Sequence, residues 1–208
     1  MNPVEKELVE MVLSGKGEAF VHLVTPYRQA LLSLAFRQTG NREDAAEVMQ
    51  ETLLRAFKYL RRFNTAGSFK NWIYQILINE SRNFQRRQAK IRRILGKAGA
   101  AIPCRSTGEA SRIPDGESGS PLQSAATDPE REALRGELRT RFLECLDGLG
   151  HREKEVFLLR DIEGLTIEET RRVLKCSSVS VRVNLSSARR KIREILIRRF
   201  PEMAKEDS

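Results

Sequence analysis

The 208-residue sequence predicts an all-α protein made of two small helical domains joined by a flexible linker. Apolar residues in both halves recur at spacings of three and four, the period of an amphipathic helix, and neither half shows a convincing strand pattern. Between the halves, residues 96–129 are rich in Gly, Pro and Ser and poor in large aliphatics, so burial there cannot offset the entropy of ordering. We therefore expect domains over 1–95 and 130–200, with a tail over 201–208.

Three helices are expected in the N-terminal domain. Apolar stripes from Phe20 to Ala35 predict the first, and a second is predicted over 44–63. The sequence NTAGS, Asn64 to Ser68, predicts a loop. A third helix is predicted over about 69–92, with a buried stripe of Phe69, Trp72, Ile73, Ile76, Leu77 and Phe84.

Four helices are expected in the C-terminal domain. The first carries an apolar stripe from Leu134 to Leu149, and the second spans 152–161. The sequence TIEE that begins at Thr166 matches the capping box that starts a helix. After a turn at Lys175 and Cys176, Ser177 is placed to cap a longer, basic helix. Together these last elements outline a helix-turn-helix.

The charge is unevenly distributed along the chain. The net charge is +9, yet residues 1–54 carry eight acids and five bases, a net of −3. Residues 82–93 hold six bases and no acid, and residues 182–199 hold seven bases against Glu194 alone. Two basic clusters favour two contacts with a polyanion, and the acidic end favours a different partner. Solvated helix faces are the competing interpretation, and composition alone does not separate the two.

Two helices carry polar stripes suited to nucleic acid. On the long C-terminal helix, arginines and serine recur opposite the apolar stripe, as a helix lying in the DNA major groove requires. The exposed stripe of the third N-terminal helix begins with amides and ends with arginines: Asn71, Gln75, Asn79, Arg82, Asn83 and Arg86. Tyr74 and the NTAGS loop are the candidates for contact with an unstacked base.

No catalytic arrangement is apparent, so we expect no enzyme, no metal and no cofactor. His22 and His151 are the only histidines, and no CxxC, HExxH or phosphate-binding glycine loop occurs. Three cysteines without close spacing fit a reducing compartment. The start of the chain lacks the basic and apolar pattern of a signal peptide, and no apolar run is long enough to span a membrane. We therefore expect a cytoplasmic protein.

The order of these motifs resembles bacterial RNA polymerase sigma factors of the extracytoplasmic-function subfamily. The segments DAAEVMQETLLRAFKYLRRF and SFKNWIYQILINESRNFQRR resemble sigma region 2. The segment LTIEETRRVLKCSSVSVRVNLSSARRKIRE resembles region 4. The resemblance implies a transcription initiation factor that binds core RNA polymerase and directs it to promoters through −10 and −35 elements. The alternative from the residues themselves is a stand-alone helix-turn-helix regulator of transcription.

The resemblance also implies site residues and partners. Polymerase binding, through the β′ coiled coil, would fall on Asp44, Glu47, Gln50, Glu51 and Leu54. The −10 element would meet Asn64, Ser68, Asn71, Tyr74, Gln75, Asn79, Arg82, Asn83 and Arg86. The −35 duplex would meet Arg182, Ser186, Ser187, Arg189 and Arg190. The β flap and an anti-sigma factor are further implied partners.

The sequence also departs from the family pattern. Lys175 stands where the turn usually has Gly, so its backbone either avoids a positive φ or is strained. Family members often have Arg, then an aromatic residue or His, then Arg at the positions of Asn184, Ser186 and Ser187, so this chain has fewer charges there and a different −35 preference is implied. Gly150 replaces a frequent Pro and leaves the start of the next helix undefined.

Overall fold

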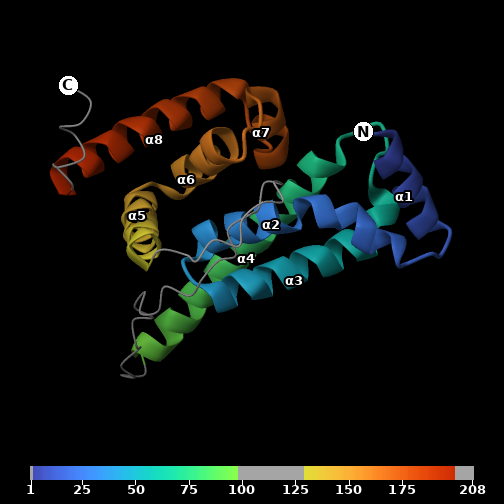
Figure 1. Cartoon of the computed structure of the whole chain (residues 1–208), viewed down its shortest axis with the longest axis horizontal. Helices are drawn as coiled ribbons and strands as arrows, with labels where there is room; N and C mark the ends of the chain where they lie inside the picture. Colours follow the sequence, from blue (N-terminus) through green and yellow to red (C-terminus); the bar gives the residue numbers. More distant parts are fainter. Residues whose placement is uncertain (1, 98–128, 200–208) are drawn as a thin grey trace. The chain divides into compact units, whose positions relative to one another are not determined.

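The computed structural model describes residues 2–97 and 129–199, and the regular structure in these ranges is helical (Figure 1). Helices α1 to α4 form the body of one compact unit, and α5, α6 and α8 form the body of another. Each unit is described by itself. Residues 96 and 97 of the predicted linker end α4, and residue 129 begins α5; the rest of the linker and the tail lie outside the described residues.

The first unit contains the expected helices and one more. Its elements are α1 (Pro3–Leu13), α2 (Ala19–Thr39), α3 (Arg42–Tyr59), the 3-10 turn η1 (Leu60–Arg62) and α4 (Phe69–Lys97). Helix α3 packs against both α2 and α4, so the core lies between these three helices. Fully buried side chains in this core include Leu23, Leu31, Leu34, Leu60, Phe69, Ile73 and Leu77.

Helix α1 was not predicted, although its start is encoded locally. Asn2 accepts a hydrogen bond from the Val4 amide at 3.3 Å, and the Glu5 carboxylate accepts one from the Asn2 amide at 3.1 Å. Pro3 occupies the first helical position, where its missing N–H is not needed. This capping box could have been recognised in the sequence.

The C-terminal half follows the predicted helix order with one change of geometry. Its elements are α5 (Pro129–Asp147), α6 (His151–Phe157), α7 (Ile167–Leu174) and α8 (Ser178–Arg199). Helix α6 continues into a π-helical turn, η2 (Leu158–Ile162), where a plain helix was expected. Gly150 is the N-cap of α6, so the helix begins at His151. The sequence alone had left this start undefined.

Glu153 joins α6 to α8. Its carboxylate accepts hydrogen bonds from the Gly150 amide at 2.7 Å, from the Ser187 hydroxyl at 2.6 Å and from the Lys191 ammonium at 2.7 Å. These contacts, led by the Lys191 hydrogen bond and followed by that of Ser187, lower the pKa of Glu153 from 4.5 to about 2. The ionised carboxylate therefore stabilises the packing of α6 on α8.

The turn between α7 and α8 contains a strained residue. Lys175 has φ +52°, a left-handed conformation that glycine adopts without strain. Among the described residues, no other non-glycine residue has a positive φ. Of the two possibilities left by the sequence, strain is therefore the one observed. The Ser177 hydroxyl accepts a hydrogen bond from the Ser180 amide at 3.1 Å, which confirms the predicted cap of α8.

Candidate nucleic-acid and protein-binding surfaces

The polar stripe of α4 lies on the side of the helix away from its core face. Asn79 and Arg86 are exposed, and Asn71, Gln75, Arg82 and Asn83 are half-buried. The opposite side holds Ile73, Leu77 and Ile78, which are at most 1% exposed. The predicted separation of an amide-and-arginine face from an apolar face is therefore present.

Tyr74 does not belong to the exposed face, which corrects the prediction made for it. Its side chain is 1% exposed, so an unstacked base cannot reach the ring. The physical reason is helical geometry: Tyr74 shares the face of Leu77 and Ile78, three and four residues later, whereas Gln75 is turned about 100° away. Tyr74 is a core residue of the first unit.

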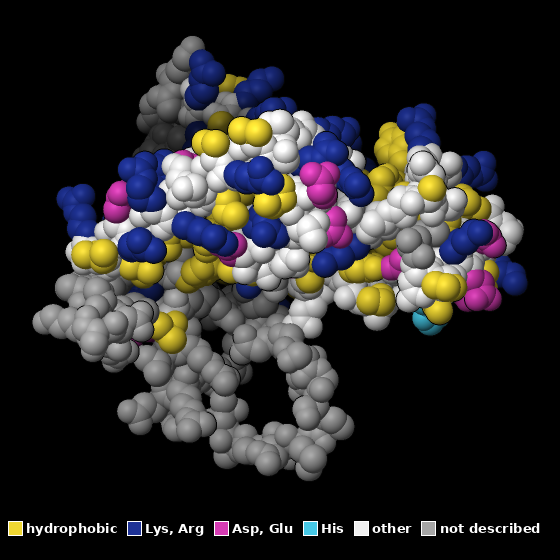
Figure 2. Space-filling view, turned by 90° about the horizontal axis from the view of Figure 1, so that it is seen from above, with side chains coloured by type: hydrophobic (Ala, Val, Ile, Leu, Met, Phe, Trp, Pro, Cys, Tyr) yellow, Lys and Arg dark blue, Asp and Glu magenta, His cyan; other side chains and the backbone are white. Residues whose placement is uncertain are grey.

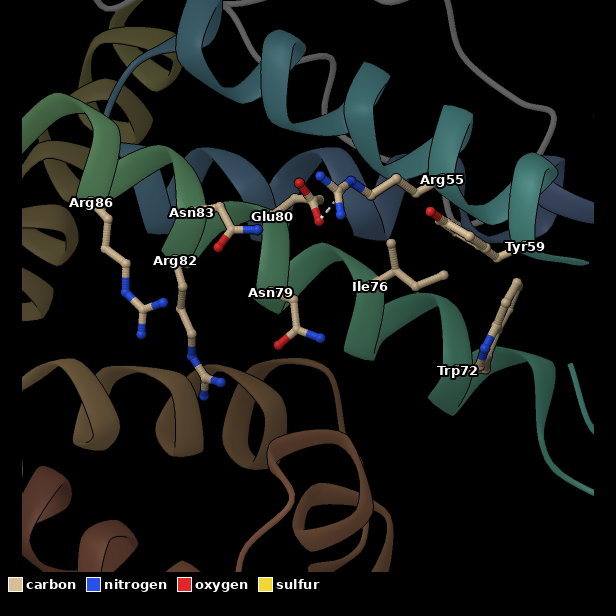
Figure 3. A pocket seen from close by; sticks show the side chains of 9 residues that line it. All are labelled: Arg55, Tyr59, Trp72, Ile76, Asn79, Glu80, Arg82, Asn83 and Arg86. Atoms are coloured by element: carbon tan, nitrogen blue, oxygen red, sulfur yellow. Dashed lines mark ion pairs between the residues drawn. The ribbon is translucent and has the colours of Figure 1, made fainter. Parts of the chain in front are cut away.

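Trp72 and Ile76 are also placed differently from the prediction. Both were assigned to the buried stripe, but both are half-buried and line a cavity between α3 and α4 of ≈ 430 Å³ (Figure 3). Four predicted DNA-binding residues line the same cavity: Asn79, Arg82, Asn83 and Arg86. The structure thus brings the C-terminal part of the predicted stripe together with an aromatic ring.

The cavity has an aromatic end and a basic end (Figure 3). Tyr59 of α3 and Trp72 of α4 close one end, and Trp72 packs against Phe63 and Phe69 with ring centroids 5.1 and 5.8 Å away. Arg82 and Arg86 lie toward the other end. These aromatic contacts hold the Trp72 ring in position while leaving part of it accessible.

An ion pair lies between the two ends. Arg55 of α3 and Glu80 of α4 approach to 3.1 Å, and the Glu80 side chain is only 6% exposed. Because Arg55 balances the Glu80 charge, the cavity offers no free carboxylate for a cation. Sequence reasoning missed Arg55, Tyr59 and Glu80, because only the packing of α3 on α4 brings them to this site.

The arrangement suits a nucleotide of an opened strand. Asparagine amides supply donor and acceptor together and can match base edges. Arginines supply positive charge for phosphates, and a partly exposed indole offers a stacking surface. The cavity therefore combines the three kinds of contact that single-stranded nucleic acid requires.

The NTAGS loop uses part of its polar groups internally. The Asn64 side chain accepts a hydrogen bond from the Ala66 amide at 2.9 Å, and the Ser68 hydroxyl accepts one from the Asn71 amide at 3.3 Å. Asn64 and Ser68 therefore shape the loop and cap α4. Neither of them lines the cavity between α3 and α4, but both line a smaller hollow on another side of Trp72, together with Asn71 and Gln75.

The five predicted protein-binding residues share one side of α3. Glu47, Gln50 and Leu54 are exposed, with Leu54 at 56%. Asp44 accepts a hydrogen bond from the Asn41 side-chain amide at 2.5 Å, so it takes part in the cap of α3. Phe57, 50% exposed, extends the apolar part of this surface and was missed by sequence reasoning.

On α8, the outward stripe retains most of its predicted residues. Arg182, Ser186, Arg189 and Arg190 are exposed. The Arg189 guanidinium donates two hydrogen bonds to the Asp161 carboxylate, at 2.6 and 2.8 Å. Ser187 is half-buried and donates a hydrogen bond to Glu153, so it takes part in the contact with α6. Its assignment to the −35 contact stays a prediction.

Known proteins resemble both halves of the chain. The family described as Sigma-70 region 2 matches residues 23–91, and the family described as Sigma-70, region 4 matches residues 139–192. The chain is 30% identical to the ECF RNA polymerase sigma-E factor of Escherichia coli K12 over 188 residues, 90% of this chain and 92% of that protein. It is 28% identical to the factor of the same name from Haemophilus influenzae over 191 residues, 90% and 93% of the two chains.

Solved structures resemble it in fold. The structure of CnrH in complex with the cytosolic domain of CnrY has a TM-score of 0.63 at 23% identity, covering 93% of this chain and 97% of that one. The sigma factor RpoE of Bartonella quintana in complex with the anti-sigma factor NepR has a TM-score of 0.60 at 22% identity, covering 85% and 96%.

Proposed function

The chain belongs to the extracytoplasmic-function family of RNA polymerase sigma factors, and we propose how its surfaces divide promoter recognition between them. As such a factor it binds core RNA polymerase and directs it to promoters; the family is not one of catalytic enzymes. The sigma-factor relatives match both halves of the chain, so the chain is not a stand-alone helix-turn-helix regulator. We assign residues 1–95 to polymerase binding and the −10 element, and residues 130–200 to the −35 element.

The cavity beside Trp72 is the observation that supports a −10 role for the first unit. It combines a partly accessible indole with Asn79, Asn83 and two arginines, on a helix whose other face is fully packed. A protein that binds only duplex DNA has no need for an aromatic surface in the same cavity as amides and arginines. We assign to this cavity a nucleotide of the separated −10 strand.

Open-complex formation tests this assignment. Asn79→Ala combined with Asn83→Ala removes the amides and leaves the packed face of α4 intact. A pair of hydrogen bonds between an amide side chain and a base contributes about 1–3 kcal/mol. We therefore expect the amount of opened promoter to fall at least about tenfold in the double variant. Strand separation would be followed by permanganate reactivity of −10 thymines with core RNA polymerase present. Ala89→Ser, an exposed change on the same helix that removes neither an amide nor a charge, serves as the control.

Binding of the variant to core polymerase and to −35 duplex is expected to stay at the wild-type level. Unchanged opening by the double variant would remove the assignment of this cavity. A parallel loss of polymerase binding would show instead that α4 had lost its structure.

The outward face of α3 is our candidate for the polymerase contact. Glu47 and Gln50 provide charge and polarity, and Leu54 with Phe57 provides apolar area. Such a face fits a helical partner that is basic and partly apolar, and the β′ coiled coil is the element that the family resemblance names. The β flap is assigned to the second unit without individual residues.

Regulation and place of action are part of the same proposal. Two proteins of similar fold are known in complexes: CnrH with the cytosolic domain of CnrY, and the sigma factor RpoE with the anti-sigma factor NepR. We propose that an anti-sigma factor likewise binds this chain, and that it acts in the cytoplasm, where RNA polymerase works. Among the described residues, no helix has the length and apolarity to cross a membrane.

A further inference from the structure

Two valines stand on the outward side of α8, where a surface helix normally carries polar residues. Val179 is 64% exposed and Val183 is 62% exposed. They are four residues apart and therefore share one face, whereas Val181, Leu185 and Ala188 are buried on the other side. Valine also has a lower helix propensity than alanine, lysine or glutamate, so the helix itself gains nothing from valines there.

Their neighbours on the same face are polar and mostly cationic. Arg182 lies between the two valines, Ser186 follows one turn later, and Arg190 comes after it, all exposed. Figure 2, a view of one side of the chain, shows more basic than acidic side chains, with hydrophobic ones among them. The valines thus form a small apolar spot within a cationic stripe.

The place of the two valines along α8 indicates what they contact. The N-terminal residues of a recognition helix contact base edges, and later residues reach the phosphates. Val179 and Val183 lie in the first two turns of α8, which begins at Ser178. They therefore occupy positions that read bases.

Valine can recognise one feature of a base edge in the major groove. It has no hydrogen-bond donor or acceptor, but it can pack on the C5-methyl group of thymine, which cytosine lacks. Residues four apart are about 6 Å apart along a helix, whereas successive bases are about 3.4 Å apart. Two methyl groups in contact with the two valines would therefore lie roughly two base steps apart.

Resting on the proposed role of α8 in duplex recognition, we propose that Val179 and Val183 bind thymine methyl groups in the −35 element. Through these contacts the sigma factor would prefer A·T pairs at two positions of the element, next to the base that Arg182 contacts. Duplex DNA is the ligand that this surface fits, because it offers apolar methyl groups flanked on both sides by phosphate anions. An apolar protein partner would gain nothing from the surrounding arginines.

The test removes the methyl groups from the DNA. Promoters selected from a library randomised at −35, with the full chain on core polymerase, provide the preferred element. Each thymine of that element is then replaced by deoxyuridine, which lacks only the methyl group. For the wild-type protein we expect two positions at which the replacement lowers affinity about fourfold, the effect of one methyl group leaving an apolar contact.

Variants connect this effect to the valines. With Val179→Ser and Val183→Ser combined, the ratio of affinities for thymine and deoxyuridine DNA is expected to fall to about one. Ile197→Ser, a change at an apolar residue that is 55% exposed in the last turns of the same helix, should keep the wild-type ratio. Far-ultraviolet circular dichroism of each variant checks that α8 remains folded.

The outcomes separate this inference from the function on which it rests. If deoxyuridine has no effect at any position while Arg182→Ala still weakens specific binding, the methyl contact is wrong and the role of α8 stands. If no −35 preference exists at all, both are wrong. If the serine variant instead loses binding to core polymerase with an unchanged thymine ratio, the valines contact protein and the inference fails.

Discussion

Lys175 in the turn before α8 adopts a conformation that costs an ordinary L-residue about 1 kcal/mol. Lys175→Gly is therefore expected to stabilise the turn by roughly 0.5–1 kcal/mol, since glycine adopts positive φ freely. Hydrogen exchange of the α8 amides would measure the change. The matched control is Gly164→Ala, because Gly164 has φ +68° and open space around it, so that alanine should destabilise by a similar amount. Faster hydrogen exchange of the α8 amides in Lys175→Gly than in the wild type would contradict the claim that Lys175 is strained.

Glu153 makes the packing of α6 on α8 dependent on pH. Its pKa, about 2, lies below the ordinary value of 4.5, so the folded state binds fewer protons than the unfolded state. Its contribution is thus complete above about pH 5 and is lost as the pH falls toward 2. Glu153→Gln should lower the free energy of unfolding at pH 7 by about 1–3 kcal/mol. Denaturant titrations at pH 7 and pH 3 should show a smaller difference between the two proteins at pH 3.

At the scale of single elements, α3 carries the proposed polymerase contact. Leu54→Lys places a charge within a 56% exposed apolar spot, so we expect binding to core polymerase to weaken at least about tenfold with little change in stability. Val4→Lys on α1, where Val4 is 59% exposed, is the matched control and should bind normally. Co-purification and a competition assay would measure both. Equal binding by the two variants would place the contact elsewhere.

Helix α4 shows how far periodicity predicts a site. The stripe from Asn71 to Arg86 was recognised because amides and arginines recur every three or four residues. Tyr74 was assigned to DNA by residue type alone, although its position one residue before Gln75 places it on the buried face. Trp72 was assigned to the core because it follows the apolar period, yet it lies where α3 leaves a cavity. Periodicity gives the face of a residue, and the neighbouring helix decides its exposure.

At the scale of the whole molecule, the net charge of +9 is a sum over regions of opposite sign. Each phosphate contact contributes about 0.9 to the slope of log affinity against log salt concentration. Arg190→Ala on α8 should reduce that slope by about this amount for −35 duplex binding, because its pair with Glu194 at 3.7 Å is exposed and weak. Arg28→Ala, an exposed change on α2, should leave the slope unaltered. An identical slope for all three proteins would place the phosphate contacts elsewhere.

The sequence by itself determined the helical class, the order of most helices, the cap of α8 and the separation of acidic and basic faces. Those features depend on local spacing and capping, which residues within one or two turns decide. The cavity of Tyr59 and Trp72, the Arg55–Glu80 pair and the turning of Ser187 toward Glu153 were decided only by tertiary structure. Each joins residues on different helices, and their contact depends on how side-chain volumes pack between helices, which no local period encodes.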